Sequence, residues 1–271
     1  MSCRFCFAQF KNVTELQKTD AITVVRMIAD NDFRKINFVG GEPTLVPWLK
    51  DAMIVARNGG LITSIITNGW NIDRGWLEEY AGYLDWIGIS IDSLYPKINS
   101  ELGRIVPGLK TPSFSSYLDS LNLVREYDIK LKINTVVNQL NKDESFHNLI
   151  KEIQPEKWKI FQVLIIENEN LGAIDLSVTI DEFNEFLVRH SDLNSVTGIF
   201  PEYCEDMKAS YLIINPAGRF VDNSAGKYHY SDCILDIGVE NALRQVNISL
   251  EKFTTRQDPN RMKNIITDVI G

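Results

Sequence analysis

Short apolar segments alternate along the chain with longer segments in which apolar residues recur every three or four positions. Five of the short segments are rich in β-branched residues and lie at 35–39, 61–67, 86–91, 130–137 and 160–166. Near-continuous apolar runs of this length are typical of parallel strands that are covered on both faces. The chain is therefore predicted to be an α/β protein with a parallel sheet, either doubly wound or curled into a barrel.

The stretches between these segments have the periodicity of amphipathic helices. The clearest is 19–31, where Thr19 or Asp20 can cap the first turn and an apolar stripe follows at Ile22, Val25, Ile28 and Ala29. Further helices are predicted over 46–58, 73–83, 114–127, 143–153 and 179–190. This alternation predicts repeated βα units up to about residue 195.

The pattern changes after residue 195. The segment 210–223 places two apolar runs around a Pro-Ala-Gly turn and predicts a hairpin, while 236–246 predicts a late helix. We therefore divide the chain into a barrel-like domain over 1–195 and a C-terminal extension over 196–271 that caps it.

Composition and charge narrow the classes of function. The chain has 271 residues, 44% of them hydrophobic, and a formal net charge of −8. It has no run of about 18 apolar residues, and its start lacks the pattern of a signal peptide, so we expect a cytoplasmic protein without a membrane span. The acidic balance argues against DNA binding, because affinity for nucleic acid comes mostly from contacts to phosphates. A local basic pocket for a small phosphorylated ligand is compatible with this charge.

Cys3 and Cys6 form a Cys-x-x-Cys pair at the start of the chain. Such a pair can bind zinc, form a redox disulfide or supply two ligands of an iron–sulfur cluster. A structural zinc site needs four ligands, and the chain has no second pair at zinc spacing. A thioredoxin-like pair should follow a strand, and none is predicted before Cys3. Cys204 and Cys233 are expected to be small, buried and unreactive.

Polar residues gather where the predicted strands end, which is where α/β proteins place their sites. The segment FVGGEPTL (38–45) places Gly40, Gly41 and Glu42 after the first strand. Two glycines let the backbone approach a ligand closely, and Glu42 adds an acceptor. Later strand ends add Thr67, Asn68 and Ser90.

Lysines interrupt the apolar strands. Lys132 and Asn134 are two residues apart in one strand and therefore lie on one face. A buried lysine is unfavourable unless it is paired with an anion. Together with Lys35, Lys159 and Arg256, Lys132 could bind a polyphosphate. His147, His190 and His229 have no partner at ligand spacing and are predicted to be surface residues.

These motifs together resemble a known family. Cys-x-x-Cys-Phe, Gly-Gly-Glu-Pro, Thr-Asn-Gly and Ser-x-Asp-Ser occur in the order seen in radical S-adenosylmethionine enzymes. The segments KINFVGGEP, LKINTVVN, WKIFQVLIIENEN, MKASYLIINPAGRF and DCILDIGVENAL are similar to those of the viperin family. The likeness runs from Cys3 to about residue 256.

The resemblance implies a partial (βα)6 radical-SAM barrel with a C-terminal extension that caps the substrate pocket. It also implies a [4Fe–4S] cluster and S-adenosyl-L-methionine as cofactors. Family members generate a 5′-deoxyadenosyl radical that removes the 4′ hydrogen of a nucleoside triphosphate. The product is the 3′-deoxy-3′,4′-didehydro nucleotide, which terminates viral RNA synthesis, so the expected role is antiviral and, in prokaryotes, antiphage defence.

The resemblance also assigns expected roles to individual residues. Cys3 and Cys6 would be cluster ligands, and Tyr211 would lie near the ribose as a proton or hydrogen donor. S-adenosylmethionine would contact Gly40, Gly41, Glu42, Thr67, Asn68, Ser90 and Arg104, with Arg104 on its carboxylate. The nucleotide would contact Lys35, Lys132, Asn134, Lys159, Lys227 and Arg256.

The chain departs from the family at its start. The family's motif is Cys-x-x-x-Cys-x-x-Cys, and its first cysteine would fall before Met1, as would the first strand. We count five apolar strands where the family has six. The simplest hypothesis is that the sequence begins at an internal methionine of a longer protein and lacks the first strand of the barrel.

Two other functions remain open from the sequence. The chain could be a radical enzyme that acts on a peptide or another small molecule, or a cluster-free remnant that binds nucleotide. The leading hypothesis requires a reductase or a flavodoxin- or ferredoxin-type protein as electron donor. The preferred base among CTP, UTP and GTP and the oligomeric state do not follow from the sequence.

Overall fold

The computed structural model describes residues 1–10, 13–106, 108 and 111–255. Its main feature is a six-stranded sheet whose strands follow one another in chain order and are all parallel. The strands are β1 (Lys35–Phe38), β2 (Ile62–Thr67), β3 (Trp86–Ser90), β4 (Lys130–Val137), β5 (Lys157–Gln162) and β6 (Gly198–Glu202). The prediction of an α/β fold with a parallel sheet is therefore confirmed, while a missing first barrel strand stays a prediction.

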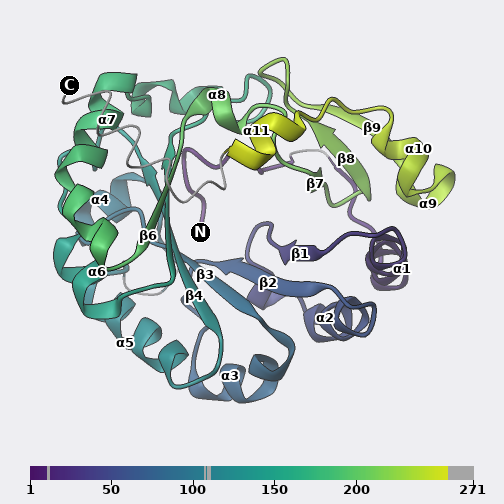
Figure 1. Ribbon diagram of the computed structural model, residues 1–271, viewed down its shortest axis with the longest axis horizontal. Coiled ribbons are helices and arrows are strands. Elements are labelled where there is room, and N and C mark those ends of the chain that lie inside the picture. Colours follow the sequence, from purple (N-terminus) through teal and green to yellow (C-terminus); the bar gives the residue numbers. More distant parts are fainter. Residues whose placement is uncertain (11–12, 107, 109–110, 256–271) are drawn as a thin grey trace.

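Helices follow the strands and cover one face of the sheet, which is curved into an arc in Figure 1. The helices up to β6 are α1 (Lys18–Ala29), α2 (Leu49–Asn58), α3 (Arg74–Tyr80), α4 (Pro96–Glu101), α5 (Phe114–Arg125), α6 (His147–Ile153) and α7 (Ile180–Arg189). Short 3-10 helices add η1 (Pro43–Leu45), η2 (Ala81–Tyr83), η3 (Leu171–Leu176) and η4 (Ser191–Ser195).

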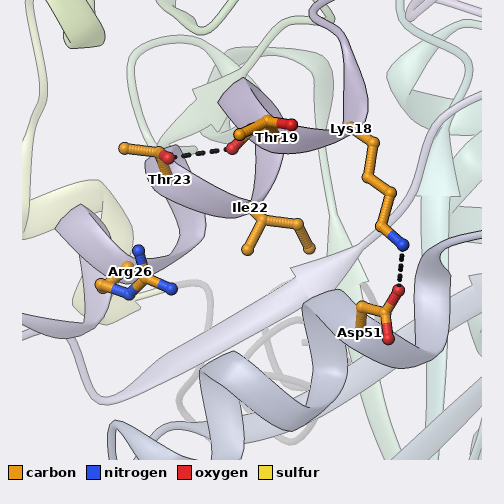
Figure 2. A pocket seen from close by; sticks show the side chains of 6 residues that line it. All are labelled: Lys18, Thr19, Ile22, Thr23, Arg26 and Asp51. Atoms are coloured by element: carbon orange, nitrogen blue, oxygen red, sulfur yellow. Dashed lines mark hydrogen bonds and ion pairs between the residues drawn. The ribbon is translucent and has the colours of Figure 1, made fainter.

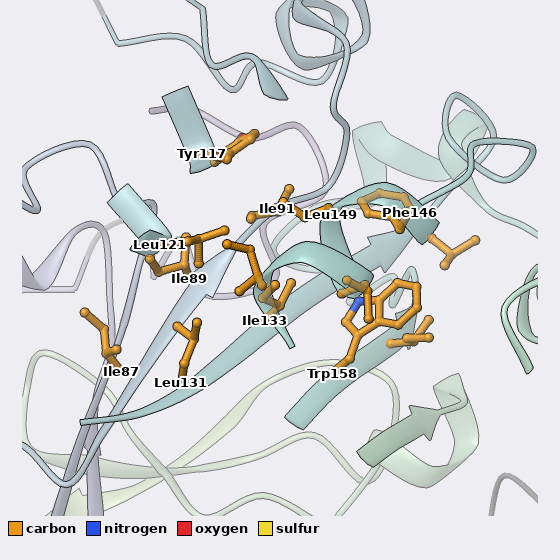
Figure 3. Close-up of a cluster of buried hydrophobic side chains, with 14 of the residues drawn as sticks. Ile87, Ile89, Ile91, Tyr117, Leu121, Leu131, Ile133, Phe146, Leu149 and Trp158 are labelled. Carbon is orange, nitrogen blue, oxygen red and sulfur yellow. The ribbon is translucent and has the colours of Figure 1, made fainter. Parts of the chain in front are cut away.

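The main hydrophobic core lies between the sheet and helices α2 to α7 (Figure 3), while α1 packs in a separate cluster. Alternate residues of the central strands point into it, among them Ile87, Ile89, Ile133 and Trp158, all fully buried. Because side chains alternate between the two faces of a strand, the residues between them belong to the opposite, inner face. The residues on the inner face do not contribute to this core, so polar and charged side chains can be placed there.

The C-terminal part forms a small antiparallel sheet with its own helices. Its elements are α8 (Cys204–Met207), β7 (Ile213–Ile214), β8 (Arg219–Asp222), β9 (His229–Cys233), α9 (Ile234–Ile237), α10 (Val239–Leu243) and α11 (Leu250–Thr255). Val221 and Tyr228 of this part pack with Leu164 and Ile166, which follow β5, and with aromatic residues of the N-terminal segment. The predicted hairpin is present as β7 and β8.

The structure corrects several details of the sequence analysis. The fifth strand begins at Lys157 instead of residue 160, and Gly198–Glu202 continues the parallel sheet beyond the proposed boundary at residue 195. The late helix is interrupted at Gly238, which has a φ of 80°. His190 is fully buried, so its prediction as a surface residue was wrong.

Candidate active site

The inner face of the sheet carries the predicted lysines. Gly88, Lys132 and Lys157 are register partners on neighbouring strands, so their side-chain positions share one face. A Cβ atom on Gly88 would lie 2.7 Å from Cε of Lys132. A glycine at this position therefore makes room for the lysine.

Lys132 is the most deeply placed of these lysines, with 8% of its surface exposed. Burial, and after it the charges of the neighbouring Lys35, Lys159 and Lys157, together lower its pKa from 10.5 to about 7. The pKa of Lys35 is lowered by desolvation and by Lys157 and Lys159. Like charges gathered in this way disfavour one another unless an anion binds among them. The cluster therefore has the chemistry of a site for a multiply charged anion.

Lys157 belongs to this cluster, although the sequence analysis did not select it. Its Nζ atom lies 5.2 Å from the ring centroid of Trp86 and 4.9 Å from that of Phe200. Nζ of Lys35 lies 5.3 Å from the same Trp86 ring. The signal in the sequence was present, because Lys157 and Lys159 alternate with the apolar Trp158.

Asn134 lies two residues after Lys132 on the same face of β4, and its register partners are Ser90 of β3 and Lys159 of β5. Its side-chain oxygen Oδ1 is buried and has no hydrogen-bond partner among the described residues. A buried oxygen without a donor is unfavourable, and native proteins seldom leave one unexplained. A ligand hydroxyl or amine would satisfy it.

Lys159, Glu202 and Tyr211 form a compact polar group at the β5–β6 end of the sheet. Glu202 of β6 is fully buried, forms an ion pair with Lys159 and accepts a hydrogen bond from the Tyr211 hydroxyl. Nζ of Lys159 donates to the same hydroxyl oxygen at 3.2 Å. The structure thus brings the predicted Lys159 and Tyr211 together, and it adds Glu202, which the sequence analysis missed.

The loop after β1 carries Gly40, Gly41 and Glu42. Gly40 has a φ of 135°, and a Cβ atom built on either glycine would meet no heavy atom within 4 Å. The Glu42 carboxylate accepts hydrogen bonds from the Thr67 hydroxyl at 2.6 Å and from the Asn68 backbone N–H at 2.9 Å. The ends of β1 and β2 are therefore joined through Glu42, with open space beside the two glycines.

Arg104 is 3% exposed and contacts three elements of the predicted site. Its guanidinium donates to Oδ2 of Asp92 at 2.5 Å, to the backbone oxygen of Ser90 at 2.6 Å and to Sγ of Cys3 at 3.8 Å. Its Nε atom is buried and has no partner among the described residues. Arg104 is already paired with the buried carboxylate of Asp92, and its expected role on the carboxylate of S-adenosylmethionine stays a prediction.

A depression on the surface lies away from these residues. Figure 2 shows it between α1 and α2, where Nζ of Lys18 pairs with Oδ2 of Asp51 at 2.6 Å and the Thr23 hydroxyl donates to the Thr19 backbone oxygen at 2.9 Å. None of the predicted site residues lines this depression. This depression therefore adds nothing to the predicted site.

Comparison with known proteins places the chain in a family. Residues 1–153 match the family described as the radical SAM superfamily. The chain is 38% identical to the S-adenosylmethionine-dependent nucleotide dehydratase of Flammeovirga pacifica, over 95% of this chain and 90% of that protein. The chain belongs to the radical SAM superfamily and, within it, to this nucleotide dehydratase family. The resemblance to viperins is thereby confirmed.

Two further relatives support this membership. The chain is 40% identical to the S-adenosylmethionine-dependent nucleotide dehydratase of Lacinutrix mariniflava, over 94% of this chain and 55% of that protein. It therefore spans about half the length of that relative. The S-adenosylmethionine-dependent nucleotide dehydratase RSAD2 of Oncorhynchus mykiss is 34% identical over 94% of this chain and 75% of that protein.

Solved structures of radical SAM enzymes share the fold. The structure described as native anSMEcpe with bound AdoMet and Kp18Cys peptide matches 94% of this chain and 78% of that one, with a TM-score of 0.70 and 17% identity. Streptococcus suis SuiB bound to S-adenosylmethionine matches 80% of this chain and 56% of that one, with a TM-score of 0.62 and 18% identity. At this identity the likeness concerns the fold alone.

Membership in the superfamily implies S-adenosylmethionine and a [4Fe–4S] cluster as cofactors, and the described residues can be tested against both. The open glycine loop and the carboxylate of Glu42 fit the methionine end of S-adenosylmethionine. For the cluster, Cys3 and Cys6 lie on one turn, in which the Cys6 N–H donates to the Cys3 backbone oxygen at 3.1 Å. Within the described ranges, no group of three His, Cys, Asp or Glu residues could hold a metal ion. The described residues therefore supply two of the three cysteine ligands that the resemblance implies for the [4Fe–4S] cluster.

The other cysteines do not join Cys3 and Cys6 in a ligand group. Burial raises the pKa of Cys204 to about 11, and Cys233 is buried. Cys233 is buried as expected, whereas Cys204 is only half-buried, and the expected lack of reactivity of both stays a prediction.

The remaining predicted residues are not brought into the lysine cluster by any described contact. Lys227 is exposed in the turn between β8 and β9. Arg256 lies outside the described residues. The roles proposed for both stay predictions. No helix in the part of the chain that the structure describes is long and apolar enough to cross a membrane.

Proposed function

We propose that the chain is a nucleotide dehydratase that uses S-adenosylmethionine to convert CTP, UTP or GTP to the 3′-deoxy-3′,4′-didehydro nucleotide. The observation that carries the proposal is the lysine cluster of Lys35, Lys132 and Lys157 on the inner face of the sheet. The cluster gives an acidic chain a local site for a triphosphate. The names of the three relatives support a nucleotide as the substrate.

Different residues of the site would contact the triphosphate and the ribose of the substrate. Lys35, Lys132 and Lys157 would bind the triphosphate, and charge-assisted hydrogen bonds to phosphate oxygens would restore the protonated form of Lys132. Asn134 would accept a hydrogen bond from a ribose hydroxyl, because its Oδ1 has no partner among the described residues. Tyr211 would contact the same sugar.

The cofactor site would lie at the loop after β1. Gly40 and Gly41 would allow close approach of the methionine part, and Glu42 would accept hydrogen bonds from its amino group. When bound and reduced, the cofactors supply a 5′-deoxyadenosyl radical. The protein contributes by positioning the substrate and by excluding water from the radical.

The role in the cell and the partners are part of the same proposal. A chain-terminating nucleotide would act against viral or phage RNA synthesis, as the family resemblance implies. One-electron reduction would come from a reductase or from a flavodoxin- or ferredoxin-type protein. The peptide bound in the anSMEcpe structure says nothing about the substrate of this chain, because the two proteins are only 17% identical.

The test is an anaerobic turnover assay on two forms of the protein. One form is the chain itself, and the other carries before Met1 an upstream segment that supplies the expected first strand and first cysteine. Each is reconstituted with iron and sulfide, then given dithionite, S-adenosylmethionine and CTP, UTP or GTP separately. Mass spectrometry measures 5′-deoxyadenosine and the dehydrated nucleotide.

We expect the extended form to make both products with at least one triphosphate. The matched control is Cys6→Ala in the extended form, which should make neither product. If the extended form produces 5′-deoxyadenosine at a rate that no triphosphate increases, the nucleotide assignment is wrong. If it binds triphosphate but never assembles a cluster, the non-catalytic alternative from the sequence analysis replaces the enzyme.

A further inference from the structure

Glu202 is a buried carboxylate that the predicted mechanism does not use. It lies at the end of β6, paired in register with Phe161 of β5, and its side chain is 0% exposed. A buried carboxylate is unfavourable unless charges and hydrogen bonds compensate it. The compensation here comes from Lys159 and Tyr211. The position of Glu202 is therefore tied to two residues of the proposed site.

The three side chains fix the direction of the Tyr211 hydroxyl. A phenol has one proton to donate and two lone pairs that accept. The Tyr211 proton is directed to the Glu202 carboxylate, while Nζ of Lys159 donates to the phenol oxygen at 3.2 Å. Nζ of Lys159 also lies 5.5 Å from the centroid of the Tyr211 ring. The ring and its hydroxyl are thus held from both sides.

Lys159 is engaged differently from the other lysines. Lys35 and Lys157 lie over the Trp86 ring, whereas Lys159 lies over Phe161 and Tyr211 and pairs with Glu202. A lysine that is already neutralised by a buried carboxylate contributes less to an anion site than one that is surrounded by like charges. Lys159 therefore belongs with Tyr211 and Glu202.

We propose that Glu202 is a positioning residue that accepts the hydrogen bond of the Tyr211 hydroxyl, so that Tyr211 meets the substrate as a hydrogen-bond acceptor. The identity of the substrate in this inference rests on the proposed function. The contacts among Lys159, Glu202 and Tyr211 do not depend on it. It changes the role expected for Tyr211, which the resemblance gives as a donor. The opposing explanation is that Glu202 serves only as the counterion of Lys159.

The first test reports on the Tyr211 ring without any turnover. 3-Fluorotyrosine is placed at position 211, and its 19F resonance is compared between the parent protein, Glu202→Gln and Glu205→Gln. Glu205 is the matched control, since it is an exposed glutamate three residues away that pairs with Lys208. We expect the resonance to move in E202Q and to stay in place in E205Q. An unchanged resonance in E202Q would overturn the proposal.

The second test is a double-mutant cycle on turnover in the extended, reconstituted form. E202Q should lower kcat about tenfold or more, since it weakens a hydrogen bond to a charged group, while KM for the triphosphate changes less than about threefold. In a Tyr211→Phe background, E202Q should change kcat by less than about twofold. An equal loss of kcat in both backgrounds would show that Glu202 acts without Tyr211 and would refute the inference.

The two tests separate this inference from the proposed function. If no triphosphate is turned over, the proposed function falls, and the 19F comparison still decides whether Glu202 holds Tyr211. If turnover is observed and the resonance does not move, the function stands and the inference fails.

Discussion

The two faces of the parallel sheet use the same strands for opposite purposes. On the helix-covered face, Trp158 and Ile160 are fully buried among other apolar side chains. On the inner face, Lys157 and Lys159 alternate with them and contact aromatic rings and Glu202. One face therefore builds the main hydrophobic core, and the other carries charged side chains that contact aromatic rings and a buried glutamate.

Two buried titratable groups show the same contrast. His190, behind the helix-covered face, is satisfied by the backbone: its Nε2 accepts from the Phe146 N–H at 3.0 Å and its Nδ1 bonds the Phe186 oxygen at 2.8 Å. Lys132, on the inner face, is surrounded by other lysines. Burial lowers the pKa of both groups, but only Lys132 gains from a bound anion.

The largest difference in the free energy of unfolding should be between substitutions of two neighbouring β5 residues that lie on opposite faces of the sheet. Trp158→Ala leaves a cavity in the main core and also removes the hydrogen bond from its Nε1 to the Thr135 hydroxyl. We expect the free energy of unfolding to fall by about 3–5 kcal/mol in urea denaturation. Lys157→Met should change it by less than about 0.5 kcal/mol. Equal destabilisation by both substitutions would contradict the division between the faces.

The next effect concerns acid stability. The pKa of His190 is lowered from 6.5 to about 4, chiefly by burial. Between these values the unfolded chain binds a proton that the folded chain does not, so stability is lost as the pH falls from 6.5 to 4, by about 3 kcal/mol. His190→Gln should flatten this slope in urea titrations at several pH values. The exposed His229→Gln is the control and should keep the slope of the parent protein.

A smaller effect in free energy should appear at the inner face. Lys132→Met removes a buried charge, so the melting temperature should stay the same or rise, while affinity for a nucleoside triphosphate should fall about tenfold or more. Lys151→Met, on the outer helix α6, removes the same charge and should leave the affinity unchanged. Calorimetric titration measures the affinity. A parallel loss of stability and affinity in K132M would mean that Lys132 is structural.

Much of the fold was predictable from the sequence. The strands at 35–39, 86–91 and 130–137 were predicted nearly to the residue, because their outer positions are mostly apolar and β-branched. The shared face of Lys132 and Asn134 followed from their spacing alone. The alternation of side chains along a strand depends only on the local backbone, so it can be predicted without knowing the tertiary contacts.

The β5–β6 end was predicted less well, for physical reasons. The strand KWKIFQ alternates lysine with apolar residues, so the strand was predicted instead over the more continuous apolar run at 160–166. The end of that run lies outside the strand, and its Leu164 and Ile166 are buried beneath the small sheet. The strand GIFPE contains a proline and ends in Glu202, and it is an edge strand, where proline is tolerated. Glu202 was missed with its strand, because only tertiary contacts give this glutamate its partners.

The central claim is that the lysines of the inner face bind a triphosphate. The most direct measurement is calorimetric titration of the protein with CTP, UTP and GTP and with the corresponding monophosphates, without any requirement for turnover. The account predicts that at least one triphosphate binds about a hundredfold more tightly than its monophosphate, and that K132M removes most of this difference. Equal affinity for triphosphate and monophosphate, unchanged by K132M, would contradict it.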